Sequence, residues 1–459
     1  MQRNTFRYIW RKMLTKSRQM GARLFIKYVY FHVLDQLTSR WRSDSIKPLD
    51  PVSLPTPMDM STNIPIINES ISVIIPTLNG GMKLRLLLRQ LAMQRGISNL
   101  EIIVIDSGSN DGSMACAAEA GAKVLTIAPE HFNHGEARNI AASKASGDYL
   151  IFLVQDVSLV TDLWMFKTVS SLKHSDNVAL TMRQIPRFDA DIFSAWLNRN
   201  HHVQLHLVKD QLLFDGISSI DSLMGNAKRR ALALDDVAMA IKADIFHDFK
   251  YLPKPFGEDI DLAYRLAKAH RKYGYLHSNP VIHSHNRRAA YWFQRGVAEG
   301  FLHGAFEPLN LHAKDPYQVV LETRLVLSHL AWSLEQHKTG VVFNYNPEDL
   351  FRGDMTGTYS KTSLFVTEQL EDIFISFPKG ESSPYEGIRN LLVSRVADML
   401  PDLSLYVSQR ELVSWHETSE AIIRAASLAV GSELGKALAP SKANPSGDLG
   451  LRNILADRI

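Results

Sequence analysis

The segment Ile71-Ser-Val-Ile-Ile-Pro-Thr-Leu-Asn-Gly80 decides the fold class of this chain. Its β-branched start is typical of a buried strand, and leucines at helical spacing follow it from Leu84 to Leu91. The same alternation predicts further strands at 102–105, 123–127 and 149–154, with helices at 114–120 and 136–146. This order predicts an α/β fold, a Rossmann-like, mostly parallel sheet flanked by helices.

Polar residues follow three of these predicted strands directly. They are Pro76-Thr77, Asp106-Ser107 and Gln155-Asp156. Ligands of open parallel sheets bind outside the carboxyl ends of the strands. We therefore expect these three pairs to converge on one edge of the sheet.

The turn that starts at Asp106 lacks the Gly-Lys-Ser/Thr ending of a P-loop, and no GxGxxG follows the first strand. Both standard phosphate cradles are thus disfavoured. An acid at a strand end instead suits hydrogen bonding to a base or a ribose. The alternative is a plain turn in which Asn110 or Asp111 caps the next helix.

Three further acidic or histidine groups allow two interpretations each. Asp156 is either a turn residue or a ligand for Mg²⁺ or Mn²⁺ on a diphosphate. Glu258 and Asp259 open a predicted helix, where acids also favour the helix dipole without any further function. His283 and His285 are spaced to face one side of a strand, as ligands of an ion or as ordinary satisfied histidines.

The 459 residues carry a formal net charge of only +3, but the charge is uneven. Residues 1–42 hold ten Lys or Arg and one acid, Asp35, so the rest of the chain is net acidic. Residues 1–44 are predicted to form an amphipathic helical arm, which packs on the body or a partner, or lies on anionic lipid. Nucleic-acid binding is disfavoured because no such motif accompanies the charge.

The composition points to a folded protein that is expected to be cytoplasmic. The single cysteine, Cys116, cannot form an intrachain disulfide, and no apolar run reaches the length of a membrane span or of a secretory signal. Three regions are expected: the arm with a proline-rich linker, 1–68; an α/β domain, 69–305; and a mainly helical region with a loose tail, 306–459. The last is expected to pack or self-associate into a homo-oligomer; the alternative is that it binds a lipid-linked acceptor or another enzyme.

Four motifs in order, within 71–79, 104–113, 132–139 and 147–156, resemble the nucleotide-sugar half of a family 2 glycosyltransferase with the GT-A fold. Arg183-Gln184-Ile-Pro186 and His283-Ser-His285 are similar to the rhamnosyltransferase-like branch in particular. The resemblance covers roughly residues 70–300, about half of the chain.

The resemblance implies a nucleotide-sugar site in which Thr77 and Asp106 hold the nucleoside, with Arg138 and Asn139 near the ribose or diphosphate. Arg183 and Gln184 would lie near the acceptor or the sugar. The full set that it implies for the nucleotide sugar is Pro76, Thr77, Asn79, Asp106, Ser107, His134, Gly135, Arg138, Asn139 and Gln155.

The resemblance also implies the catalytic and metal groups. Asp156, with His285 and less directly His283, would bind the cation. Asp259 would be the general base and Glu258 would steady the acceptor; the helix N-terminus is expected to keep Asp259 ionised. The chain departs from the family at Gln155, where an acid is more usual, and at 235–236, where acids replace Asn or Ser.

These observations predict an inverting transfer of a sugar, such as rhamnose from dTDP-rhamnose, to a surface polysaccharide or a lipid-linked glycan. The basic arm would place the enzyme peripherally at the inner face of the membrane. The alternative is an inactive nucleotide-sugar-binding or scaffold subunit. A nucleotidyltransferase is disfavoured because Pro76 to Gly81 offers no charged side chain.

Overall fold

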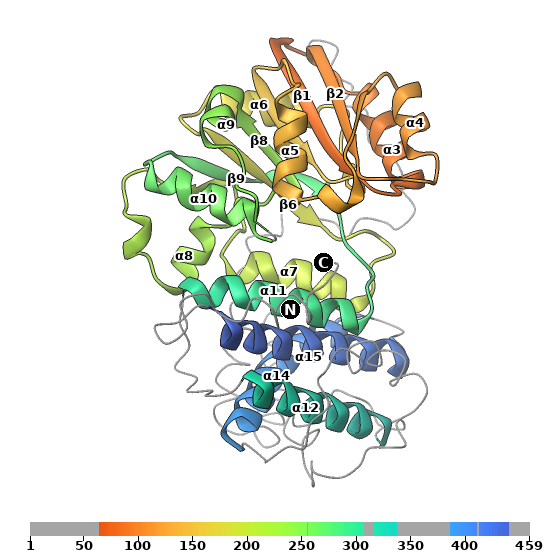
Figure 1. The fold of residues 1–459 in the computed structure, drawn as a ribbon, viewed down its shortest axis with the longest axis vertical. Coiled ribbons are helices and arrows are strands. Elements are labelled where there is room, and N and C mark those ends of the chain that lie inside the picture. The colour runs from red at the N-terminus through yellow and green to blue at the C-terminus, as the bar shows by residue number, and fades with distance from the viewer. Residues whose placement is uncertain (1–63, 255, 307–315, 337–385, 411–412, 440–459) are drawn as a thin grey trace, which may run out of the picture. The chain divides into compact units, whose positions relative to one another are not determined.

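The computed structural model describes residues 64–254, 256–306, 316–336, 386–410 and 413–439 (Figure 1). The predicted arm at 1–42, nearly all of the linker and nearly all of the tail from 439 lie outside these residues. The chain divides into two compact units, which are described separately. We call Leu54–Ala190 with Ser194–Asn286 the sheet unit, and the rest, which includes Asp191–Phe193 and Arg287–Ile459, the helical unit.

The sheet unit contains one nine-stranded sheet of order β3-β2-β1-β4-β8-β6-β9-β5, with β7 paired to β9. Pairing is parallel from β3 to β4 and between β6 and β9, and antiparallel where β8, β5 and β7 join. The strands are β1 (Ile67–Thr77), β2 (Ile97–Asp106), β3 (Lys123–Thr126), β4 (Tyr149–Leu153), β5 (Ser158–Leu159), β6 (Ala179–Ile185), β7 (Gln211–Phe214), β8 (Ala238–Lys242) and β9 (Tyr273–Ile282). The expected α/β fold is confirmed, and its parallel part is the half that the strand motifs predicted.

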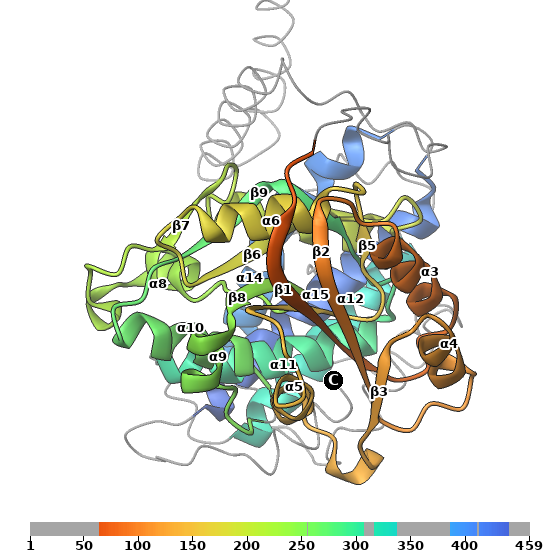
Figure 2. The same cartoon turned by 90° about the horizontal axis from the view of Figure 1, so that it is seen from above.

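Helices cover both faces of this sheet, as expected (Figure 2). The helices α3, α4 and α6 pack on one face, and α5, α8, α9 and α10 pack on the other. Their bounds, with those of α7, are α3 (Gly81–Ala92), α4 (Ser113–Glu119), α5 (His134–Ala142), α6 (Trp164–Lys173), α7 (Ile192–Gln204), α8 (Gly225–Ala231), α9 (Ala243–Phe249) and α10 (Glu258–Lys268).

The central strands read as continuous apolar runs because both of their faces are buried. Ile74 and Phe152 pack toward α5 and α9, whereas their chain neighbours Val73 and Ile151 pack toward α3 and α6. Neighbouring side chains point to opposite faces of a strand, so each run fills two cores at once.

The strand β1 begins earlier and ends later than the sequence suggested. It continues through Pro76, which the sequence analysis read as the end of the strand, to Thr77. Pro76 is tolerated because pairing of β1 with β4 stops at Ile74, so no partner there needs its missing N–H. In register, Thr77 lies beside Asp106 of β2, which brings two of the predicted strand ends together.

The helical unit contains α11 (Ala289–Phe306), α12 (Pro316–Gln336), α14 (Glu386–Ser408) and α15 (Trp415–Leu438). Residues 287–305 were expected to belong to the α/β domain, whereas α11 groups with the helical unit and packs against α15. A Cβ on Gly300 would lie 2.0 Å from the Ser432 carbonyl oxygen, and one on Gly435 would lie 2.1 Å from that of Val297. The two backbones touch, so only glycine fits at either position.

No helix among the described residues is both long and apolar enough to span a membrane.

Candidate active site

Three loops meet at the carboxyl ends of β1, β2 and β4 and are tied together by amide side chains. The Gln155 side chain accepts from Leu78 N at 3.0 Å and donates to Leu78 O at 3.0 Å. Asn79 accepts from Asn110 N at 3.0 Å and donates its own backbone N–H to Ser109 Oγ at 2.7 Å. A carboxylate at position 155 could not donate to the Leu78 carbonyl. This hydrogen bond is a local structural reason for glutamine at a position where the similar family more usually has an acid.

Asp106 lies at the end of β2 and is 1% exposed. Its Oδ2 accepts from Gly108 N at 3.0 Å and Ser109 N at 2.9 Å, while its Oδ1 is buried without a hydrogen-bond donor among the described residues. Ser107 donates its backbone N–H to Thr77 O at 3.0 Å, and both side chains are buried. A buried carboxylate oxygen without a donor suits an N–H or O–H of a bound nucleoside.

The N-terminus of α5 holds the segment that leads into α10. Asn133 caps α5, and Gly135 lies so close that a Cβ there would be 2.8 Å from Tyr251 Cβ. The Asn139 side chain donates to Tyr251 O at 2.8 Å and accepts from Tyr251 N at 2.9 Å. His134 begins α5 and packs edge-on against Phe132, with ring centroids 4.8 Å apart. Gly135 and Asn139 therefore hold the segment around Tyr251, which precedes α10, against α5.

Arg138 is 3% exposed and lies among acids. Its Nε is 3.1 Å from Asp236 Oδ2, and its Nη1 is 3.3 Å from Glu258 Oε1. The resemblance implied a place near the ribose or diphosphate, whereas the structure places this guanidinium inside an ion-pair cluster. Glu258, expected to steady the acceptor, is likewise buried against Arg138.

Asp259 forms an acidic group with Asp235 and Asp236. One carboxylate oxygen from each of the three lies within 4.8 Å of those of the other two. Burial, and then the charges of Asp236, Glu258 and Asp235, raise the pKa of Asp259 well above that of an ordinary aspartate. This corrects the expectation that the first turn of α10 keeps Asp259 ionised. The helix dipole favours the charged form, but desolvation and three neighbouring carboxylates outweigh it.

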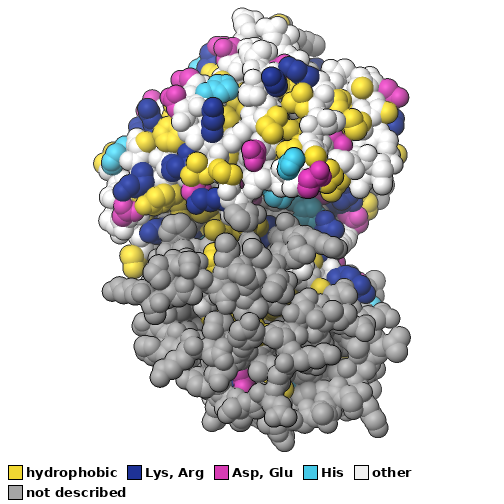
Figure 3. Space-filling view, viewed as in Figure 1, with side chains coloured by type: hydrophobic (Ala, Val, Ile, Leu, Met, Phe, Trp, Pro, Cys, Tyr) yellow, Lys and Arg dark blue, Asp and Glu magenta, His cyan; other side chains and the backbone are white. Residues whose placement is uncertain are grey.

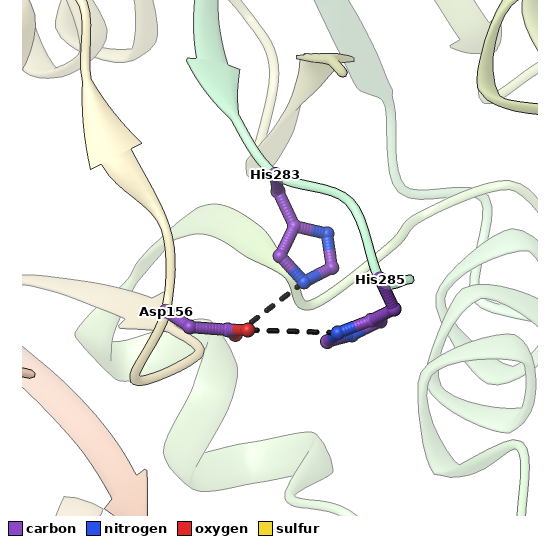
Figure 4. Close-up of side chains that lie close together, drawn as sticks. All are labelled: Asp156, His283 and His285. Atoms are coloured by element: carbon purple, nitrogen blue, oxygen red, sulfur yellow. Dashed lines mark ion pairs between the residues drawn. The ribbon is translucent and has the colours of Figure 1, made fainter. Parts of the chain in front are cut away.

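The side chains of Asp156, His283 and His285 converge from two loops (Figure 4). Asp156 Oδ1 is 3.5 Å from His283 Nε2, and its Oδ2 is 3.5 Å from His285 Nδ1. Both histidines follow the end of β9 at Ile282, so they lie just beyond the strand on which the sequence placed them. Lys83 Nζ, 3.2 Å from Asp156 Oδ2, is a further member that the sequence analysis missed.

These three side chains fit a divalent cation. Burial raises the pKa of Asp156, but His283, His285 and Lys83 outweigh it and hold that pKa well below its ordinary value, so the carboxylate is ionised. His283 is 6% exposed, and its Nε2 makes no hydrogen bond within the part of the chain that the structure describes. An ionised carboxylate and two imidazoles that face one point are a ligand set used by divalent metals.

Gln184 connects this cation set to the acidic group. Its Oε1 is 2.8 Å from His283 Nδ1, and its Nε2 donates to Asp235 Oδ2 at 2.5 Å. Its neighbour Arg183 instead lies 2.9 Å, through Nη1, from His277 Nε2. Asp235 and Asp236 were noted in the sequence only as unusual acids; their link to Asp259 depends on how β8 is paired, which no local motif reveals.

The visible face of the sheet unit has no single-sign charged area that would identify a further site. Figure 3 shows basic, acidic and apolar side chains interspersed over that face. The sites described above are therefore defined by their buried groups.

Comparison with known proteins relates this fold and these groups to glycosyltransferases. Residues 72–231 match the family model described as Glycosyl transferase family 2. Within the sheet unit, this segment is similar to family 2 glycosyltransferases, and the relatives below place the similarity on the rhamnosyltransferase side of that family.

Two curated relatives support this assignment. The O-antigen chain rhamnosyltransferase RfbN of Salmonella typhimurium is 27% identical over 237 residues, which cover 51% of this chain and 72% of that protein. The O-antigen chain rhamnosyltransferase WbaN of Salmonella anatum is 28% identical over 207 residues, 44% of this chain and 62% of the relative. Among solved structures, the mannosyltransferase PcManGT of Pyrobaculum calidifontis in complex with GDP-Man and Mn²⁺ is 16% identical, with a TM-score of 0.43 over 87% of this chain and 96% of that one.

Proposed function

We propose that the protein transfers a sugar from a nucleoside-diphosphate sugar to a hydroxyl of a surface polysaccharide or lipid-linked glycan, with inversion. The observation that carries this proposal is the single amide of Gln184, which joins a cation set, Asp156 with His283 and His285, to the acidic group of Asp259. A donor site and a proton-accepting site must be this close for one displacement to use both.

For the donor, the buried Oδ1 of Asp106 offers a hydrogen-bond acceptor to the base or the ribose, beside Thr77 and Ser107. Pro76, Asn79 and Gln155 shape the loop above it. The two relatives named as O-antigen chain rhamnosyltransferases favour rhamnose on the donor and an O-antigen-like glycan as the acceptor.

Asp156, His283 and His285 would hold Mg²⁺ or Mn²⁺ against the diphosphate. When bound, such an ion neutralises the charge that develops on the leaving nucleoside diphosphate. Lys83, whose Nζ lies 3.2 Å from Asp156, adds a second positive charge at the same place.

For the transfer itself, Asp259 would take the proton from the acceptor hydroxyl. The oxygen then forms a bond to the anomeric carbon while the bond from that carbon to the diphosphate oxygen breaks, and its electron pair leaves with the nucleoside diphosphate. One such displacement inverts the anomeric centre. Only the ionised form of Asp259 can accept this proton; its raised pKa makes that form a stronger base than an ordinary aspartate and confines it to higher pH, while Arg138 offsets the charge of Asp236 and Glu258.

The basic segment at 1–42 would hold the enzyme at the inner, anionic face of the cell membrane, with the catalytic unit in the cytoplasm. The helical unit would serve self-association or acceptor binding.

The proposal is tested with purified full-length protein, a panel of nucleoside-diphosphate sugars, Mn²⁺ or Mg²⁺, and glycan acceptors. We expect thermal stabilisation by one donor class, release of its nucleoside diphosphate on addition of acceptor, and an inverted anomeric configuration in the product by NMR. Retention would refute the single displacement. Binding without turnover on every acceptor would favour the scaffold alternative.

A further inference from the structure

The hydrogen bonds of Gln184 determine where the proton of His283 sits. The NH₂ end of the Gln184 amide faces Asp235, because Gln184 Nε2 donates to Asp235 Oδ2 at 2.5 Å. The carbonyl oxygen of Gln184 therefore points to His283 Nδ1, 2.8 Å away. A carbonyl oxygen only accepts, so Nδ1 of His283 must carry the hydrogen.

Nε2 of His283 is then the ring nitrogen that can bind a metal. In the neutral imidazole a protonated Nδ1 makes Nε2 the lone-pair nitrogen. Nε2 is buried, makes no hydrogen bond to any described residue, and faces Asp156 Oδ1 at 3.5 Å. When His283 is neutral, as a metal ligand must be, Nε2 and the Asp156 carboxylate are two buried acceptors that face each other, and a cation bound by both stabilises them.

We propose that Gln184 is a positioning residue: anchored by Asp235, it fixes the ring orientation and the tautomer of His283 so that Nε2 is presented to a divalent metal. The inference rests on the proposed metal site and adds what sets its selectivity. Mg²⁺ prefers oxygen ligands and water, whereas imidazole nitrogen suits transition metals, so Gln184 should act on Mn²⁺ affinity far more than on Mg²⁺ affinity.

The test measures metal binding to the full chain without donor, by the electron paramagnetic resonance signal of free Mn²⁺ and by Mg²⁺ competition. Gln184→Leu removes both hydrogen bonds at nearly constant volume. We expect it to weaken Mn²⁺ binding about 10- to 100-fold, as loss of an outer-shell partner does, with little change for Mg²⁺.

Two further variants separate positioning from a general structural effect. Thr181→Val removes another hydrogen bond of β6 to Asp235, from Thr181 Oγ1 to the Asp235 carbonyl at 2.7 Å, without touching His283. It should leave the Mn²⁺ affinity unchanged. The exchange Gln184→Glu with Asp235→Asn keeps an acceptor for the Nδ1–H and a donor from position 235, so it should restore Mn²⁺ binding to near the wild-type level.

Wild-type Mn²⁺ affinity in Gln184→Leu, together with a loss in His283→Ala, would overturn the positioning role. Equal losses in Gln184→Leu and Thr181→Val, or failure of the exchange to restore binding, would also overturn it. Unchanged Mn²⁺ affinity in His283→Ala would instead refute the metal site and with it that part of the proposed function.

Discussion

Arg138 has two candidate roles, one implied by its motif and one indicated by its burial among acids. From the sequence it resembled a donor-binding arginine, but it lies between Asp236 and Glu258 with almost no exposed surface. Either the guanidinium contacts the donor diphosphate, or it stabilises the buried carboxylates of Asp236 and Glu258.

Replacing Arg138 with methionine should therefore lower the free energy of unfolding strongly, by about 3–5 kcal/mol, because two buried acids lose their counter-charge. Denaturant unfolding measures this change. Lys268→Ala, which breaks an exposed pair with Asp221, is the control and should have little effect. If Arg138→Met kept its stability and lost donor affinity instead, the arginine would be a donor ligand.

Asp259 should give the reaction an unusual pH dependence. Because its pKa is raised, kcat/KM should fall with decreasing pH at a higher pH than for an ordinary aspartate. Asp235→Asn removes one of the charges that raise this pKa, so it should move the acid limb to lower pH. An acid limb that did not move, or that moved upward, would argue against Asp259 as the group that titrates.

At the scale of elements, α11 and α15 pack backbone to backbone within the described part of the helical unit. Gly300→Ala would place a Cβ 2.0 Å from the Ser432 carbonyl oxygen, so the helices must separate, at a cost of about 1–3 kcal/mol in unfolding free energy. Ser432→Ala is the matched control on the facing helix, since it adds no atom at this contact. Equal thermal midpoints for Gly300→Ala and the wild type would contradict the close packing.

Elements were predictable from the sequence where one local pattern decides them. The runs around Ile74, Ile103 and Ile151 are strands because both faces are buried, and the leucines of α3 repeat at helical spacing. The strands β5 to β8 were not predicted, and β9 was indicated only by the histidine pair that follows it, because their pairings join distant segments and no local motif marks them. The convergence of Asp235 and Asp236 on Asp259 follows from those pairings, so the acidic group could not be read from any one motif.

At the scale of the whole molecule, charge is divided between a basic segment and an acidic remainder. Deletion of residues 1–42 should reduce sedimentation with vesicles that contain anionic lipid and leave turnover of a soluble acceptor nearly unchanged. Vesicles of neutral lipid are the control. A loss of turnover as large as that of Asp259→Asn would assign this segment to the fold or to the active site.

The central claim is that one site binds a nucleotide sugar and Asp259 deprotonates the acceptor. The most direct measurement compares nucleoside-diphosphate release by the wild type and by Asp259→Asn, at saturating donor, acceptor and Mn²⁺. We predict that the variant binds the donor as tightly as the wild type but turns over about 10² to 10⁴ times more slowly. Turnover by Asp259→Asn at the wild-type rate would contradict the account.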